Sequence, residues 1–170
     1  MSVKELPVRK HPRLKGYDYN QNGSYFITFC VKDKHEILGQ LSVGRGILDA
    51  PLVILSEYGN ALREAIEFLN NNENGIDIVH YVIMPNHVHM IVRVEKLYGG
   101  ASRMPRPTNA LIPKLVSSIK RFTNKKVGFN LWQRSFHDHI IRSADEYLRI
   151  WQYIDENPMR WFEDIYYIPK

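Results

Sequence analysis

Two periodicities run through the hydrophobic positions of this 170-residue chain, one typical of strands and the other of helices. Runs rich in β-branched and aromatic residues predict strands over 25–31, 76–84 and 87–94. Apolar residues spaced three and four apart predict amphipathic helices over 56–70 and 109–124, and a third from Ser143 to about Asn157. The intervening segments 131–136 and 140–142 are interpreted as a turn and a short extended stretch.

The predicted strand over 87–94 carries two histidines separated by one residue. Side chains alternate across a strand, so His87 and His89 share one face. The other face holds the apolar residues Val88, Met90, Val92 and Val94. The histidines therefore lie off the main apolar layer, and two adjacent imidazoles are able to hold one divalent cation. The alternative is a pair of solvent-facing histidines on a half-buried strand.

The last predicted helix brings two further polar groups onto one face. Ser143 followed by Glu146 fits a capping box and marks the helix start. Tyr153 and Asn157 are four residues apart and share a face, at the border of the apolar stripe. The Tyr153 hydroxyl is thus placed to reach a ligand. The alternative is an ordinary amphipathic tyrosine, with its ring packed and its hydroxyl in water.

Composition places the chain among soluble globular proteins, with 44% hydrophobic and 24% charged residues. Its length predicts one domain over 1–170. The single cysteine, Cys30, lies in an apolar run and is interpreted as a buried structural thiol. No apolar run approaches the roughly 20 residues of a membrane span, and the N-terminus lacks a signal-peptide core. These features predict a cytoplasmic protein without membrane contact.

The basic residues are unevenly placed, although the net charge of +5 is modest. They cluster in the N-terminal segment 1–20 and in the helix over 109–124, while 96–108 is predicted as a mobile loop. The alternative for the central cluster is an ordinary solvated surface. Candidate contacts to nucleic-acid phosphates are Arg13, Lys15, Lys120, Arg121, Arg134 and Arg142.

Taken together, the motifs have the order and spacing of one family. They are His-x-His at 87–89, a basic helix, Leu-Trp-Gln-Arg-Ser-Phe at 131–136 and Tyr-Ile-x-x-Asn-Pro at 153–158. The segments 13–19 and 23–28 add to the likeness. The chain resembles the single-tyrosine HUH transposases of insertion sequences and, among them, the REP-associated tyrosine transposases of bacteria.

The resemblance implies a ferredoxin-like α+β fold, with an antiparallel β-sheet packed with α-helices. It implies that His87, His89 and Asn157 bind Mg²⁺ or Mn²⁺, and that Tyr153 is the nucleophile. The implied activity is cleavage and rejoining of single-stranded DNA hairpins through a 5′-phosphotyrosine, in the bacterial cytoplasm. It leaves both a homodimer and a monomer open.

Two other classes of function compete with this interpretation. A ferredoxin-like fold also serves nucleic-acid-binding modules, so the chain could bind hairpin DNA or RNA without cutting it. A metal-dependent hydrolase would use water in place of Tyr153. The sequence identifies no general base for the tyrosine, since the nearby His139 and Asp138 are more typical of structural or DNA-contacting residues.

Overall fold

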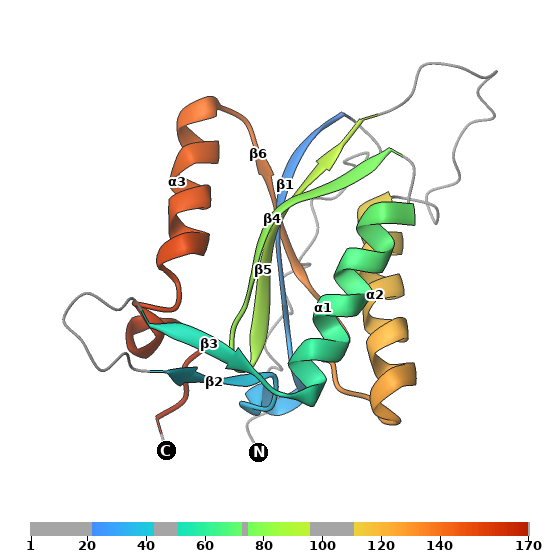
Figure 1. Ribbon diagram of the computed structural model, residues 1–170. Helices are drawn as coiled ribbons and strands as arrows, with labels where there is room; N and C mark the ends of the chain where they lie inside the picture. Colours follow the sequence, from blue (N-terminus) through green and yellow to red (C-terminus); the bar gives the residue numbers. More distant parts are fainter. Residues whose placement is uncertain (1–21, 43–50, 73–74, 96–110, 170) are drawn as a thin grey trace, which may run out of the picture.

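A four-stranded antiparallel sheet forms the centre of the computed structural model, which describes residues 22–42, 51–72, 75–95 and 111–169. The strands lie in the order β4-β5-β1-β6. Their bounds are β1 Gly23–Cys30, β4 Ile76–Ile83, β5 His87–Val94 and β6 His137–Ile141. Helix α1, Glu57–Asn72, connects β1 to β4, and helix α2, Leu111–Val127, connects β5 to β6 (Figure 1). This βαββαβ order is the ferredoxin-like arrangement, which confirms the predicted α+β fold.

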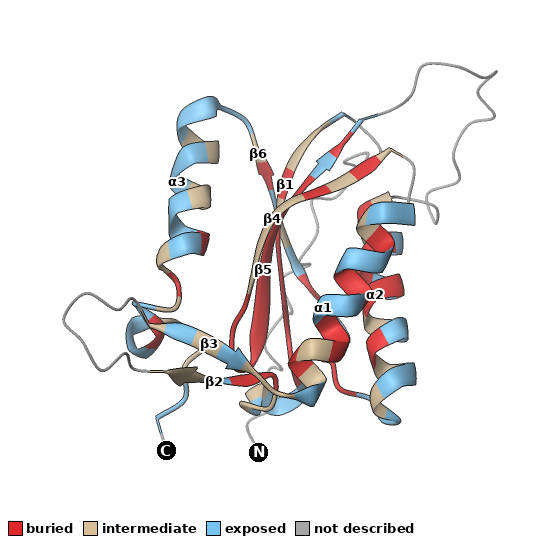
Figure 2. Ribbon diagram, viewed as in Figure 1, coloured by how far each residue is buried: buried red, intermediate tan, exposed pale blue. Residues whose placement is uncertain are grey.

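Two layers of helix cover the two faces of the sheet. Helices α1 and α2 lie together on one face, and helix α3, Ala144–Glu156, lies on the other (Figure 1). The main core is between the sheet and the α1–α2 layer, where the alternate residues Tyr25, Ile27 and Phe29 of β1 are buried (Figure 2). Trp132 is also buried there, with its ring 4.9 Å from that of Phe29.

Helix α3 is held to the sheet more by polar pairs than by apolar burial. Ile154 is its one buried residue, and Leu148, within the predicted apolar stripe, is 65% exposed. His80 on β4 pairs with Asp155 at 2.8 Å and stacks on Trp151, with ring centroids 4.0 Å apart. These contacts anchor the carboxyl-terminal half of the helix, which carries the candidate nucleophile.

The capping prediction for α3 is confirmed. The Ser143 hydroxyl accepts a hydrogen bond from the Glu146 amide at 3.2 Å. Glu146 reaches back in turn, although its carboxylate accepts from the amide of Arg142 at 2.7 Å, one residue before the cap. The same carboxylate bonds to His139 on β6 at 2.7 Å. The start of α3 is therefore tied to the edge strand β6.

Several short elements escape the sequence pattern. Strands β2, Gly39–Ser42, and β3, Leu52–Leu55, pair as a separate two-stranded sheet. Two 3₁₀ turns, η1 over Lys32–Lys34 and η3 over Trp161–Glu163, complete the described elements. Four residues give too few alternations to reveal a strand. The N-terminal segment 1–20 with Arg13 and Lys15, and the whole of the predicted mobile loop over 96–108, lie outside the described residues.

The structure also bears on the predictions about Cys30 and about membrane-spanning segments. Cys30 is buried, as predicted, and burial raises the pKa of its thiol to about 11. None of the helices in the described ranges has the length and apolar character needed to cross a membrane.

Candidate active site

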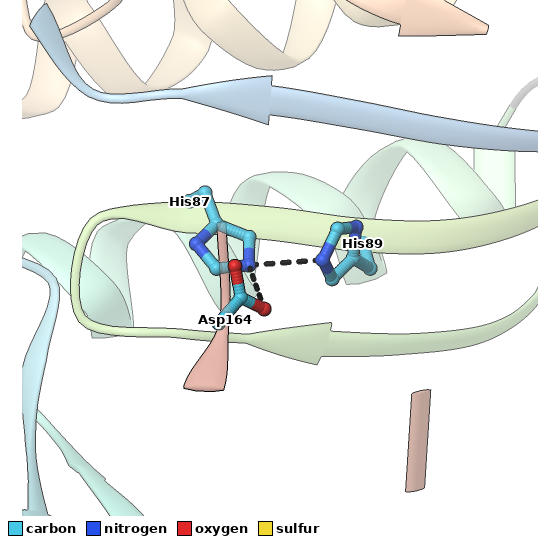
Figure 3. Close-up of side chains that lie close together, drawn as sticks. All are labelled: His87, His89 and Asp164. Atoms are coloured by element: carbon cyan, nitrogen blue, oxygen red, sulfur yellow. Dashed lines mark hydrogen bonds and ion pairs between the residues drawn. The ribbon is translucent and has the colours of Figure 1, made fainter. Parts of the chain in front are cut away.

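Strand β5 presents His87 and His89 to the face of the sheet that α3 covers. The alternate residues Val88 and Met90 point into the α1–α2 core, as the strand pattern predicts. The imidazoles are not solvent-facing, however, because His87 is 0% exposed and His89 is 1% exposed. Their Nε2 atoms lie 3.0 Å apart (Figure 3). The alternative of a wet surface pair is therefore wrong.

Aromatic rings enclose the two histidines. The Phe26 ring stacks on His89 with centroids 5.2 Å apart, and the Tyr153 ring packs against His89 at the same distance. The Tyr166 ring lies 4.6 Å from His87. Tyr166 belongs to the segment after α3, which explains why strand parity alone did not predict the burial. The result is a low-dielectric site in which electrostatic interactions are strong.

Neighbouring groups orient both imidazoles through their Nδ1 atoms. The Asn86 side-chain oxygen lies 2.8 Å from His87 Nδ1, so this nitrogen carries the proton and Nε2 keeps a lone pair. The amide of Asn86 donates to the carbonyls of Lys34 and Tyr166, which fixes its own orientation. Such hydrogen bonds to the second nitrogen are typical of metal-binding histidines.

His89 has a more adaptable partner. Its Nδ1 lies 2.7 Å from the Thr28 hydroxyl, which is able to donate or accept. Both tautomers of His89 are therefore accommodated. With the proton on Nε2, His89 donates a hydrogen bond to His87 Nε2. With the proton on Nδ1, the Nε2 lone pairs of His87 and His89 face the same point. The second arrangement needs a cation between the lone pairs, since two lone pairs facing each other at this distance repel.

Burial keeps both imidazoles neutral. It lowers the pKa of His87 to about 3, with help from the charge of Lys34. It also lowers the pKa of His89 well below its usual value, and the neighbouring His87 adds to the effect. Neutral imidazole is the form that binds metal ions.

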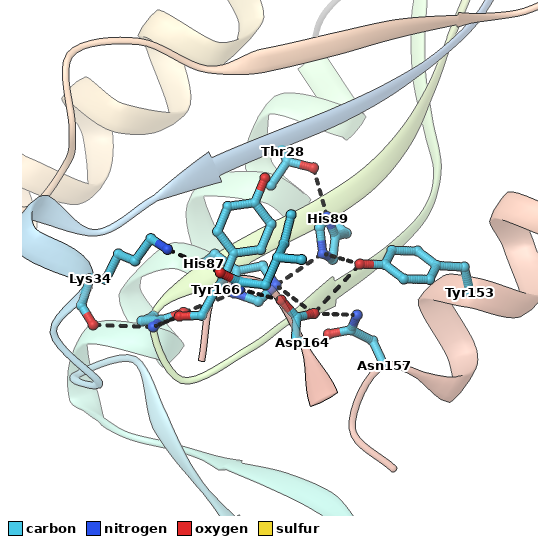
Figure 4. A network of polar contacts seen from close by, with 10 residues as sticks. Thr28, Lys34, His87, His89, Tyr153, Asn157, Asp164 and Tyr166 are labelled. Atoms are coloured by element: carbon cyan, nitrogen blue, oxygen red, sulfur yellow. Dashed lines mark hydrogen bonds and ion pairs between the residues drawn. The ribbon is translucent and has the colours of Figure 1, made fainter. Parts of the chain in front are cut away.

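Helix α3 brings the predicted tyrosine to this pair. The Tyr153 hydroxyl lies 3.3 Å from His89 Nε2 (Figure 4). The residue is 39% exposed. Burial of the hydroxyl, with the carboxylate of Asp164 nearby, raises the pKa of Tyr153 to about 12. The phenol is thus protonated at neutral pH and partly open to a ligand.

The structure adds a carboxylate that the sequence analysis missed. Asp164 and the two histidines place ligand atoms within 4.8 Å of one another. Asp164 Oδ2 lies 3.9 Å from His87 Nε2 and accepts a hydrogen bond from the Asn157 amide at 3.0 Å (Figures 3 and 4). Asp164 follows the last predicted helix in a segment without periodicity. The available signal was an acidic residue seven positions after Asn157, which is weak.

Asn157 reaches the cluster through Asp164. It is buried at the end of α3, and its side-chain oxygen has no hydrogen-bond partner. An orphaned buried oxygen is costly unless a ligand or ion satisfies it. Asp164 thus offers an oxygen donor near two imidazole nitrogens, and the Asn157 side chain that binds it carries an unsatisfied oxygen.

The donor set fits a small divalent cation. Adjacent ligands of an octahedral ion, each at about 2.1 Å, lie about 3.0 Å from one another. This is the separation of the two Nε2 atoms, 3.0 Å. Oxygen donors suit Mg²⁺ and Mn²⁺, and imidazoles suit other first-row divalent ions such as Zn²⁺. The structure therefore contains a candidate His-His-Asp metal site, to which Asn157 is linked by its hydrogen bond to Asp164.

The candidate DNA contacts are spread over several surfaces. Lys120 is half-buried on α2, where its ammonium donates to the carbonyls of Gln133 and Ser135 at 2.8 Å each. Burial lowers the pKa of Lys120 to about 8. Two of the three N–H donors of Lys120 are therefore occupied by the protein, and its contact with phosphate stays a prediction.

The other described arginines of the set are exposed. Arg121 lies on α2, in the layer across the sheet from Tyr153, and its guanidinium is 5.7 Å from the Phe122 ring. Arg134 lies between α2 and β6, and Arg142 between β6 and α3. They do not converge on the histidine pair.

Neither neighbouring candidate base is positioned for that role. His139 is bonded to Glu146, as described for the start of α3. Asp138 pairs with Ile27 across the strands, so its side chain belongs to the α1–α2 face of the sheet.

Comparisons with known proteins point to one family. Residues 19–157 match the family model described as "Transposase IS200 like". An uncharacterized protein of Haemophilus influenzae is 31% identical over 94% of this chain and 93% of its own length. A second H. influenzae protein, assigned as a REP-associated tyrosine transposase, is 22% identical over 84% of this chain and 74% of its own.

A solved structure supports the fold independently. A REP-associated tyrosine transposase bound to a REP hairpin superimposes with a TM-score of 0.60 and 21% identity, covering 91% of this chain and 74% of that one. Asp164 lies beyond the segment that the family model matches. The match over 19–157, the shared fold and the clustered histidines lead to one conclusion: this chain belongs to the IS200-like transposase family.

Proposed function

We propose that this protein is a metal-dependent single-strand DNA endonuclease and strand transferase of the REP-associated type. The observation that carries the proposal is the Tyr153 hydroxyl, 3.3 Å from His89 Nε2 in the metal-binding cluster. Membership of a transposase family supports DNA as the substrate, and this contact places the hydroxyl beside a residue that would hold the metal ion. The bound hairpin in the REP-associated relative supports hairpin-bearing single strands as the form of DNA.

The reaction follows from the groups in the site. Tyr153 Oη attacks the scissile phosphorus and loses its proton, the 3′-oxygen departs and takes up a proton, and a 5′-phosphotyrosine results. A bound Mg²⁺ or Mn²⁺ would supply Lewis-acid stabilisation of the phosphate oxygens and of the phenolate. His87, His89, Asn157 and Asp164 would hold that ion. Because the ester bond energy is kept in the phosphotyrosine, a 3′-hydroxyl can reverse the step and join strands.

A single chain carries all of these groups. Tyr153 on α3 faces the histidines of its own β5, so the active site we propose is complete within one protomer. The monomeric alternative is favoured by this arrangement.

Labelled DNA tests the proposal. A hairpin-bearing single strand labelled at its 3′ end, incubated with Mn²⁺, is expected to give a denaturation-resistant protein–DNA adduct, and the same strand labelled at its 5′ end is not. Cleavage without any adduct would support hydrolysis by water. Tight binding without cleavage would support a silent hairpin-binding module.

Asp164 provides a second, independent prediction. If its carboxylate is a cation ligand, Asp164→Ala removes one donor and is expected to weaken Mn²⁺ affinity about 10- to 100-fold, the range seen when a supporting partner of a metal site is lost. Isothermal titration calorimetry of the DNA-free protein measures this effect. Glu163→Gln, which neutralises the exposed neighbour, is the matched control. Equal affinities in the two variants would remove Asp164 from the ligand set.

A further inference from the structure

A small cavity opens next to the nucleophile. Its volume is about 220 Å³, and its walls include Phe26, His137, His139, Tyr153 and Ile165. Its mouth is partly open to solvent, as the exposure of His137 and Ile165 shows. The cavity is smaller than the roughly 300 Å³ at which drug-sized ligand sites begin. It therefore suits a single planar ring system rather than an extended ligand.

The sheet register explains why this wall is flat and aromatic. Thr28 of β1 lies between His89 of β5 and His137 of β6, and Phe26 lies beside His139 in the next row. Cross-strand partners share a face, so these side chains form a continuous surface under α3. The Phe26 ring meets the edge of Tyr153, with centroids 6.0 Å apart. A ligand in the cavity thus lies in contact with the nucleophile's own ring.

The two histidines of β6 differ in their partners. The His139 imidazole is hydrogen-bonded to the Glu146 carboxylate. Among the contacts of the described residues, the exposed His137 imidazole makes none, and it occupies the open edge of the sheet. Its ring nitrogens are free to donate to or accept from a ligand. His137 is not part of the metal cluster, so its position at the cavity suggests a separate role in binding a ligand.

We propose that this cavity is a nucleobase pocket, which holds the base of the nucleotide adjoining the scissile phosphate; this inference rests on the proposed function. The base stacks within the aromatic wall, with Phe26 and Tyr153 as its neighbours, and His137 hydrogen-bonds its edge. Stacking on aromatic side chains tolerates any base, because every base has a planar π-face. The contact from His137 adds discrimination between bases. The pocket thereby positions the phosphate for attack by Tyr153.

A binding experiment tests the pocket without requiring cleavage. The protein is Tyr153→Phe, which keeps the ring of the pocket wall and cannot form the ester. The probes are hairpin-bearing single strands with 2-aminopurine at each unpaired nucleotide at the foot of the hairpin in turn. Binding is expected to change the fluorescence strongly at one of these positions, because the fluorophore stacks on protein aromatics there. An abasic nucleotide at that position is expected to weaken binding about 10-fold.

The His137→Ala substitution, added to Tyr153→Phe, identifies the site. It is expected to weaken binding of the intact strand about 5-fold and to leave binding of the abasic strand unchanged. His35→Ala, at an exposed histidine outside the pocket, is the matched control and should change neither. Equal losses for intact and abasic strands, or uniform fluorescence along the foot of the hairpin, would overturn the pocket.

The outcomes also separate this inference from the proposed function. A position-specific fluorescence change in Tyr153→Phe, with no adduct formed by the wild-type protein, would keep the pocket and reject the transferase. An adduct with wild-type protein but no preferred fluorophore position would keep the transferase and reject the pocket. Failure to bind hairpin strands at all would reject both.

Discussion

Replacing Tyr153 with Phe is expected to abolish the covalent protein–DNA adduct while leaving hairpin binding within about twofold of the wild type. The substitution removes one oxygen, the atom that lies 3.3 Å from His89 Nε2, and keeps the ring that packs on Phe26 and His89. Attack by water could cleave the strand but would leave no adduct, because the covalent ester requires an oxygen from the protein. Denaturing gels measure the adduct, and fluorescence anisotropy measures binding.

Tyr166→Phe is the control that makes this result specific. The Tyr166 ring also borders the histidines, and burial raises the pKa of its phenol to about 12, as for Tyr153. The two phenols are thus matched in environment, and only Tyr153 has its oxygen in contact with His89. Adduct formation should survive in Tyr166→Phe. Survival in Tyr153→Phe with loss in Tyr166→Phe would transfer the nucleophile to Tyr166.

The sequence predicted the parts of the fold that repeat a local rule. Alternation placed His87 and His89 opposite Val88, and the four-residue spacing placed Tyr153 and Asn157 on one face of α3. Ser143 and Glu146 marked the start of that helix because a cap is a local hydrogen-bond pattern. These features need no knowledge of tertiary contacts.

The missing parts depend on contacts between segments far apart in the sequence. Asp164 and Tyr166 reach the histidines because the chain turns back toward β5 after α3. The side chain of Asn86, the residue before His87, donates to the Tyr166 carbonyl and holds this segment in place. The two carbonyl partners of Lys120 were likewise not predicted, because they lie 13 and 15 residues away in the sequence. Composition cannot reveal which donors the fold itself satisfies.

Metal binding is expected to stabilise the wild-type fold and to fail in His89→Ala. An ion that binds only the folded state adds about 2.7 kcal/mol when its concentration is 100 times Kd. For a chain of this size, that corresponds to a rise in Tm of about 5–10 °C. His89→Ala removes the nitrogen that lies 3.0 Å from His87 Nε2, and with it one ligand of the ion. The Mn²⁺-dependent rise in Tm should therefore disappear, and adduct formation should fall at least about 100-fold.

The thermal measurement distinguishes a lost ligand from a damaged fold. His89 is buried among aromatic rings, so His89→Ala also leaves a cavity and is expected to lower the metal-free Tm. The relevant quantity is therefore the difference between Tm with and without Mn²⁺ within each variant. His35→Ala, at an exposed histidine, should retain the full difference. If His89→Ala retains it as well, the ion that stabilises the fold binds elsewhere, and the buried pair serves packing rather than catalysis.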